Sequence, residues 1–304
     1  MKILITGGAG YKGIKLTAKL LAKGYKVTVL DNFMYGFDPF LFLAENKNLE
    51  VKKQDIRNDI KDLHTFDVIF HLAGISGLPA CAANPHSARV INVDATKKLV
   101  EGLGTGQLII NASTTSFYGK LGTICDEETP IEAISWYGIT KYEAEQIVLQ
   151  KENSISLRFA TVFGFSPKMR MDLMVNDFVY RAIKEGMIVL FNSYAKRTFI
   201  HIDDAIDCYI FAMENADRMR GSVFNAGGED LNYSKKEIAE IVNNFIPVKI
   251  IDTDTQDKDL RNFITSFKKI EGVGFKPNKT IEDGINELIR VFSFYDYYSH
   301  YKTI

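Results

Sequence analysis

Cysteine is scarce in this chain of 304 residues, and Cys81, Cys125 and Cys208 are far apart, with no Cys-x-x-Cys pair. This spacing offers neither a disulfide framework nor the ligand pairs of a structural zinc site. It is typical of a reducing compartment, so we expect a cytoplasmic protein without a metal. A chain of this length can bury a large core without covalent cross-links.

An excess of charge of one sign is also lacking. Lys and Arg number 37 against 38 Asp and Glu, which gives a formal net charge of -1. Such a balance excludes a broad electrostatic attraction for nucleic acid or for an anionic membrane. Any anionic ligand must therefore be held by a few local basic residues, and we expect no nucleic-acid partner.

Long hydrophobic runs are absent as well. In the opening stretch MKILITGGAGYKG, glycines interrupt the apolar run before it reaches the length of a signal peptide's apolar region. No later stretch approaches the roughly 20 consecutive apolar residues of a membrane-spanning helix. We therefore expect no association with a membrane.

Short apolar strands alternate with helical patterns in the first half of the chain. The predicted strands cover residues 3–5, 26–30, 49–53, 66–70, 108–111 and 156–159, and the predicted helices cover residues 14–22, 58–63, 85–103 and 137–150. This alternation predicts an α/β fold with a doubly wound parallel sheet and helices on both faces.

The pattern changes after about residue 165. Helical patterns cover residues 172–185, 234–244 and 281–292, and a short strand covers residues 248–251. We expect residues 166–304 to form a smaller mixed α/β lobe, with residues 190–220 packing back on the first domain, residues 1–165. The additional length is where a substrate would be held.

A glycine-rich turn follows the first predicted strand. Gly7, Gly10 and Gly13 flank Tyr11 and Lys12 and open the first helix. Glycines there permit a tight turn and let backbone N–H groups approach a pyrophosphate at the helix N-terminus. A turn without a ligand is the alternative, but Asp31 ends the next strand, where an acid accepts the ribose hydroxyls and repels a 2′-phosphate. These residues favour NAD over NADP and predict a Rossmann-type domain.

Two further patterns carry chemistry. Tyr137 and Lys141 are four residues apart on a predicted helix, so an ammonium would lie beside a phenol and stabilise its phenolate. A phenolate can take the proton of a substrate alcohol while hydride leaves the carbon. A run of hydroxyl residues that includes Thr114 follows the fifth strand, where open α/β sheets bind ligands. Each pattern alone also occurs by chance.

Together these motifs resemble the extended short-chain dehydrogenase/reductase family, the NAD-dependent epimerases and dehydratases of nucleotide sugars. The resemblance covers about residues 1–290. It rests on TGGAGYKG, Asp31, Asp55-Ile56, HLAG at residues 71–74, Asn92, the run before Tyr118-Gly119, and Tyr137 with Lys141, in that order.

The resemblance implies residue roles. Tyr137 would be the acid/base, Lys141 would bind the nicotinamide ribose, and Thr114 would supply the catalytic hydroxyl. The cofactor-binding residues implied are Gly7, Gly10, Tyr11, Lys12, Gly13, Asp31, Asn32, Asp55, Ile56, Leu72, Ala73, Gly74, Asn92, Tyr137 and Lys141. The substrate-binding residues implied are Ser76, Thr114, Thr115, Thr161, Asn176, Arg197 and Arg261, of which Asn176 and the two arginines would hold the diphosphate. Relatives pair through helices that correspond to residues 92–103 and 137–150, which implies a homodimer.

Some residues depart from the family pattern, and one of these departures limits the reactions that the chain can catalyse. Thr115 and Ser116 stand where 4,6-dehydratases carry an acid pair, which argues against dehydration. Lys12 replaces an apolar residue, and we expect its side chain to be solvated. His201, Asp203 and Asp204 suggest packing and helix capping rather than a metal site.

The stretch SPKMRMDL looks most like a subgroup that oxidises GDP-linked heptoses at C4. We therefore expect oxidation of the sugar C4 hydroxyl to a 4-keto sugar, as in a GDP-heptose 4-dehydrogenase, with a UDP- or GDP-sugar 4-epimerase as the alternative. A regulatory NAD-binding protein without catalysis is disfavoured, because both Tyr137 and Lys141 are present.

Overall fold

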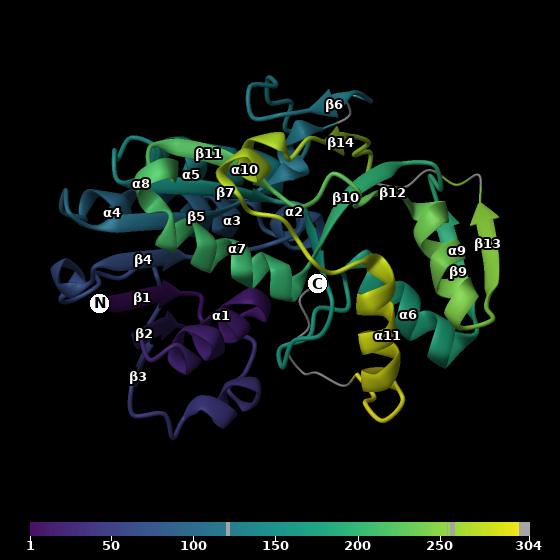
Figure 1. Cartoon of the computed structure of the whole chain (residues 1–304), viewed down its shortest axis with the longest axis horizontal. Helices are drawn as coiled ribbons and strands as arrows, with labels where there is room; N and C mark the ends of the chain where they lie inside the picture. The colour runs from purple at the N-terminus through teal and green to yellow at the C-terminus, as the bar shows by residue number, and fades with distance from the viewer. Residues whose placement is uncertain (120–121, 254, 256–258, 298–304) are drawn as a thin grey trace.

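The chain folds around one parallel sheet with a smaller lobe at its carboxyl edge (Figure 1). The structure, a computed structural model, describes residues 1–119, 122–253, 255 and 259–297. Within these residues, none of the helices has both the length and the apolar character needed to cross a membrane.

The central sheet confirms the predicted α/β fold. Its seven strands follow the order β11-β7-β5-β4-β1-β2-β3, and every neighbouring pair is parallel. The strands are β1 (Lys2–Thr6), β2 (Lys26–Asp31), β3 (Leu49–Lys53), β4 (Val68–His71), β5 (Leu108–Thr114), β7 (Ser154–Phe159) and β11 (Ser222–Ala226). The chain reverses its direction of winding between β1 and β4, and such a switch point is where open sheets bind nucleotides.

Alternation along the strands produces two cores. In β1, Ile3 and Ile5 pack in the core that contains α1 (Tyr11–Ala22) and α7 (Ile202–Glu214). Leu4 faces the opposite core, which contains α4 (Ala95–Glu101) and the end of α5 (Trp136–Val148). Residues in both cores are apolar and almost fully buried, as a sheet covered on both faces requires.

The second half of the chain builds a separate lobe and also returns to the first. The lobe contains α6 (Met174–Glu185), α9 (Lys235–Phe245), α11 (Ile281–Phe292), the parallel pair β9 (Met187–Phe191) and β13 (Lys249–Thr253), and the sheet of β8 (Thr161–Phe163), β10 (Lys196–His201) and β12 (Asn232–Ser234). The returning segments are α7, α8 (Ala216–Met219), β11 and α10 (Lys268–Val273). Since β11 extends the central sheet beside β7, the first domain is completed by residues far along the chain.

Shorter elements connect these layers. They include α2 (Leu78–Ala83), α3 (Pro85–Arg89), a π-helical turn at Val90–Asp94, and the parallel pair β6 (Ile124–Cys125) and β14 (Ile264–Thr265). The helix predicted over residues 58–63 is wrong: this stretch is a loop that leads to a short 3-10 turn, Leu63–Thr65. Asp62 adopts a left-handed conformation there with φ of 58°, which an α-helix cannot include.

A buried ion pair fixes α5 to the sheet. The Arg158 guanidinium on β7 donates to both carboxylate oxygens of Glu145 on α5 at 2.8–3.1 Å, and the side chains are 5% and 0% exposed. The Arg158 Nη1 also donates to the Tyr118 hydroxyl at 2.9 Å. Removing one partner would leave an unpaired buried charge.

We predict that Glu145→Ala lowers the free energy of unfolding by about 3–5 kcal/mol. Denaturant unfolding followed by circular dichroism measures this loss. Glu185→Ala is the matched control, because its pair with Arg181 is exposed and should contribute little. Equal losses in the two variants would contradict the role of burial.

Candidate active site

The glycine turn is packed too closely for any larger residue. Gly7 has φ of 72°, and a Cβ on it would lie 2.7 Å from the backbone nitrogen of Ala73. A Cβ on Gly13 would lie 2.2 Å from the carbonyl oxygen of Gly7. Gly10 is the N-cap of the twelve-residue helix α1 and makes no side-chain cap. The first N–H groups of α1 are thus presented in a cradle that fits a pyrophosphate.

Asp31 stands beside this cradle at the end of β2. Its carboxylate accepts the backbone N–H groups of Ala9 at 3.0 Å and Phe33 at 2.8 Å. Burial raises the pKa of Asp31, and these N–H bonds oppose that shift. The carboxylate oxygens keep further lone pairs, which suit the two hydroxyls of a ribose.

The residues assigned to the adenine side lie on the neighbouring loop. The Arg57 guanidinium lowers the pKa of Asp55 to about 2, and the amide of Asn32 donates to the Asp55 carboxylate at 3.4 Å. Ile56 is buried in the core next to β1. The contacts of these residues with an adenine stay a prediction.

Asn92 ties together the parts of the site. Its side chain forms two hydrogen bonds with the backbone of Ile75 at 2.8 and 3.0 Å, and it donates to the Thr140 hydroxyl on α5 at 3.1 Å. A Cβ on Gly74 would lie 2.8 Å from the Asn92 amide oxygen. Leu72, Ala73 and Gly74 follow β4 directly, so this amide holds that segment against the helix that carries Tyr137.

Tyr137 and Lys141 occupy the first turns of α5, which Ser135 caps by accepting the N–H of Gly138 at 3.1 Å. Lys141 is 8% exposed, and burial lowers its pKa to about 8. Thr114 is the last residue of β5, and its hydroxyl accepts the N–H of Ser116 at 3.1 Å. The first turns of α5 therefore carry a phenol and an ammonium, and the end of β5 carries a hydroxyl at the carboxyl edge of the sheet.

Arg197 and Arg261 meet at one carboxylate. Asp259 lies 3.2 Å from Arg197 Nη2 and 2.6 Å from Arg261 Nη2. Although burial alone would raise its pKa, the two guanidinium groups hold the pKa of Asp259 well below its usual range. Arg261 also donates to the Ser116 hydroxyl at 2.6 Å, so the pair adjoins the end of β5. The sequence analysis did not find Asp259, which comes only two residues before Arg261.

The remaining substrate residues have partners within the protein. The buried amide of Asn176 accepts the N–H of Gly164 at 3.0 Å and donates to the carbonyl of Arg170 at 3.0 Å. The Thr115 hydroxyl donates to the carbonyl of Phe159 at 3.2 Å, and Thr161 opens β8 just beyond it. Their contacts with a substrate stay predictions.

Arg170 is a site residue without an assigned role in the sequence analysis. Its guanidinium donates to the Ser76 hydroxyl at 3.1 Å and pairs with Asp172 at 2.5 Å. Burial lowers the pKa of Arg170, whereas its pairing with Asp172 and, to a smaller extent, the Tyr137 and Tyr11 hydroxyls raise it. The segment SPKMRMDL, which contains Arg170, stands out in the sequence, but nothing in it predicts the contact with Ser76.

The expectation of a solvated Lys12 is wrong. Its ammonium lies 4.1 Å from the centroid of the Phe159 ring and 5.4 Å from that of Tyr209. The side chain is only half-exposed, because β7 and α7 bring these aromatic faces over the start of α1.

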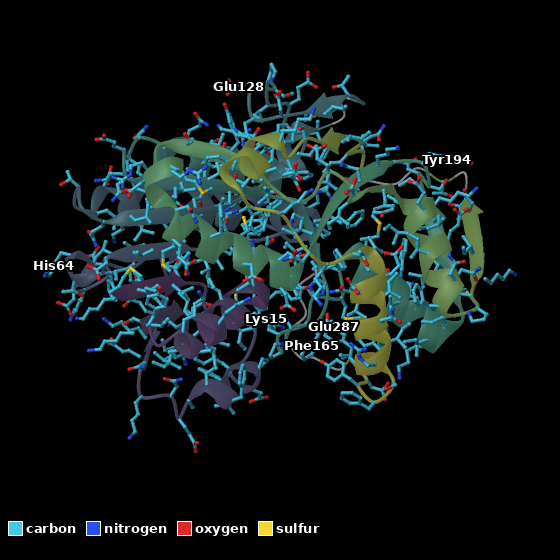
Figure 2. All side chains as sticks on the ribbon, viewed as in Figure 1. Lys15, His64, Glu128, Phe165, Tyr194 and Glu287 are labelled. Carbon is cyan, nitrogen blue, oxygen red and sulfur yellow. The ribbon has the colours of Figure 1, made fainter. Side chains whose placement is uncertain are left out.

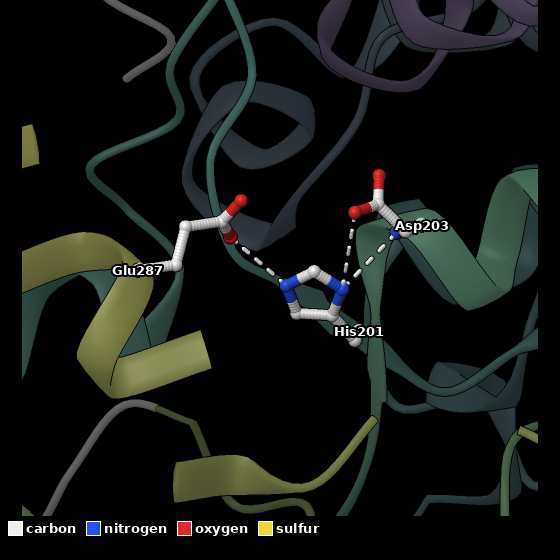
Figure 3. A group of neighbouring side chains, drawn as sticks. All are labelled: His201, Asp203 and Glu287. Atoms are coloured by element: carbon white, nitrogen blue, oxygen red, sulfur yellow. Dashed lines mark hydrogen bonds and ion pairs between the residues drawn. The ribbon is translucent and has the colours of Figure 1, made fainter. Parts of the chain in front are cut away.

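His201, Asp203 and Glu287 form a cluster whose potential ligand atoms lie within 4.8 Å of one another (Figure 3). His201 Nε2 lies 3.0 Å from Glu287, and Nδ1 accepts the N–H of Asp203 at 3.3 Å. Lys15 pairs with Asp203 at 2.5 Å, and Glu287 accepts the N–H of Phe165 at 3.0 Å. Lys15 also donates to the carbonyl of Phe165 at 3.2 Å, and the labels of Lys15, Phe165 and Glu287 lie together in Figure 2. These atoms already have partners within the protein, and their contacts join α1, the start of α7 and α11.

A family model described as "NAD dependent epimerase/dehydratase family" matches residues 3–227. CDP-paratose 2-epimerase of Salmonella typhi is 29% identical over 95% of this chain and 98% of its own length. An uncharacterized UDP-glucose epimerase of Bacillus subtilis is 31% identical over 76% of this chain and 78% of its own length.

Solved structures share the fold. UDP-glucuronic acid 4-epimerase from Bacillus cereus, in complex with UDP-glucuronic acid and NAD, superposes with a TM-score of 0.85 at 23% identity, covering 96% of this chain and 99% of that one. A dTDP-glucose 4,6-dehydratase from Streptomyces venezuelae, with NAD bound, has the same TM-score at 22% identity, covering 96% and 97%.

Asp31→Ala should relax the preference for NAD over NADP. Removing the carboxylate removes its repulsion of a 2′-phosphate, and we expect the ratio of NADP to NAD affinity to rise about tenfold or more. Calorimetric titration with both cofactors measures the ratio. An unchanged preference would mean that the ribose site is elsewhere.

Proposed function

Since this chain belongs to the NAD-dependent epimerase/dehydratase family, we propose that it oxidises the C4 hydroxyl of a nucleotide-diphosphate sugar. The observation that supports the proposal is that Thr114 ends β5 at the carboxyl edge of the sheet, the edge at which the glycine turn follows β1, while Tyr137 and Lys141 lie in the first turns of α5. No acid pair accompanies them, because Thr115 and Ser116 follow Thr114. This supports oxidation without loss of water.

Lys141, Tyr137 and Thr114 have separate roles in removing the hydroxyl proton. The Lys141 ammonium stabilises the Tyr137 phenolate, which removes the proton of the C4 hydroxyl. The Thr114 hydroxyl hydrogen-bonds the same oxygen and orients it toward Tyr137. The bound NAD supplies the hydride acceptor that makes the product a 4-keto sugar.

The fate of the keto sugar defines the enzyme. Return of hydride to the opposite face of the sugar gives a 4-epimerase, and the relative described as an uncharacterized UDP-glucose epimerase supports an epimerase. Release of the keto sugar gives a 4-dehydrogenase, for which residues 166–173 provide the support through their resemblance to the GDP-heptose subgroup. We place epimerisation first and C4 dehydrogenation of a GDP-heptose second.

We also propose where the diphosphate of the substrate binds and which surface forms a homodimer. The planar forks of Arg197 and Arg261 suit phosphate oxygens, and Asp259 keeps the two forks close together. A groove between α4 and α5, lined by Val93, Val100, Tyr142 and Ile147 among others, suits pairing with a second copy in a homodimer.

Tyr137→Phe should lower turnover by about 10²–10⁴-fold, because the variant lacks the proton acceptor. NAD affinity should stay unchanged. Product formation from UDP-, GDP- and dTDP-sugars, followed by mass spectrometry in deuterated water, measures turnover. The same assay separates an epimer from a hydrated 4-ketone. Near-normal turnover in the variant would refute the mechanism.

Arg261→Ala should raise KM for the nucleotide sugar roughly tenfold or more, because a charge-assisted contact with phosphate is lost. The affinity for NAD should not change. Arg218→Ala, on the short helix α8, is the control for a lost surface charge. A fall in cofactor affinity alone would show that the diphosphate lies elsewhere.

A further inference from the structure

Lys12 brings an additional positive charge into the cofactor cleft. It is the second residue of α1, where the backbone N–H can serve a pyrophosphate whatever the side chain is. The side chain leaves the helix toward β7 and places its ammonium over the faces of Phe159 and Tyr209. An ammonium over an aromatic face is attracted by the ring, so this position is a defined one.

The strand that carries Phe159 shows which half of the cofactor cleft contains the Lys12 ammonium. Phe159 is the last residue of β7 and pairs in register with Thr114 at the end of β5. In the sheet order, β5 and β7 lie on one side of β1, whereas β2 with Asp31 lies on the other. Since Asp31 marks the adenosine ribose, the Lys12 ammonium lies on the side where hydride must pass near Tyr137.

The charges around Lys12 are of one sign. Burial, followed by the charges of Lys141 and Arg170, lowers its pKa to about 7, and the Cys208 thiol on α7 opposes that shift. Among the residues that the structure describes, no carboxylate forms an ion pair with the Lys12 ammonium. Lys141 and Arg170 therefore add positive charge near the Lys12 ammonium, and of the three cations Arg170 is paired with a carboxylate, that of Asp172.

We propose that Lys12 is a redox-tuning residue, which makes the protein bind NADH in preference to NAD⁺. The oxidised nicotinamide ring carries a positive charge, and the reduced ring carries none. A nearby ammonium therefore destabilises only the oxidised form, whereas its attraction for the pyrophosphate is the same in both forms. The inference needs only the NAD site and not the identity of the sugar.

This preference has a consequence for the proposed reaction. The C4–H bond of the sugar breaks, its two electrons and hydrogen form a C–H bond on the nicotinamide, and the hydroxyl proton goes to Tyr137. The ring charge disappears in this step, so the repulsion from Lys12 is relieved as the ketone forms. Lys12 thus shifts the equilibrium on the enzyme toward keto sugar and NADH. This consequence, unlike the preference for NADH itself, rests on the proposed function.

The test compares the dissociation constants of NAD⁺ and NADH without any sugar. We would titrate wild type and Lys12→Ile by calorimetry, with NADH fluorescence as a second readout, at about pH 6, where the lysine is protonated. The wild-type ratio Kd(NAD⁺)/Kd(NADH) should exceed that of Lys12→Ile about tenfold, which corresponds to a repulsion of roughly 1.4 kcal/mol between the ammonium and the oxidised ring.

Two further variants provide matched controls. Lys12→Arg keeps the charge and should keep the wild-type ratio. Lys19→Met removes a charge from the same helix, where the lysine pairs with Asp207 at the surface, and should also leave the ratio unchanged. Circular dichroism confirms that each variant is folded.

Two outcomes would overturn the inference. Equal weakening of both cofactors in Lys12→Ile would show a contact with the pyrophosphate alone. An unchanged ratio would show that the ammonium is too far from the ring. Failure of the C4 oxidation assay with an altered ratio would refute the proposed function and leave the role of Lys12 intact.

Discussion

The buried ion pair between Arg158 and Glu145 is the constraint on which the active site depends. It joins β7 to the second half of α5, while Asn92 joins the first half to the segment after β4. Neither charge of the pair can be hydrated, so each holds the other in place. Tyr137 and Lys141 lie on the part of α5 between or before these attachments. The positions of Tyr137 and Lys141 relative to the sheet therefore depend on contacts that take no part in the chemistry.

Several of the polar contacts between the two lobes lie at the cofactor helix α1. The Tyr11 hydroxyl donates to the carbonyl of Gly164 at 2.7 Å, and the Ser166 hydroxyl donates to the carbonyl of Tyr11 at 2.8 Å. One turn later, Lys15 reaches the His201 cluster through Asp203. These bonds form within two turns of the glycine cradle, so the substrate lobe is positioned from the same helix that presents its N–H groups to NAD.

How far the sequence could predict the structure depended on the length and regularity of each signal. Runs such as residues 26–30 are apolar and β-branched, and all six predicted strands of the first half appear in the central sheet. The strands β8 and β12 have only three residues each, and β10, the central strand of their sheet, begins with Lys196 and Arg197, so none of them contains a long apolar run. The helix predicted over residues 58–63 had too few residues to outweigh the turn at Asp62. The motif positions around the glycine turn and Tyr137 were readable because their spacing is local.

The sequence by itself determined the chemical groups available: the glycine turn, the acid at Asp31, and the pair of Tyr137 and Lys141 four residues apart. It also determined the absence of a dehydratase acid pair beside Thr114. Only the tertiary structure decided which charges meet. Asp259 between two arginines, Arg170 at Ser76, and Lys12 over Phe159 join residues that are distant in the chain or point in unexpected directions. Local spacing specifies side chains on one helix or turn, whereas burial and the packing of separate elements set the field in which those side chains act.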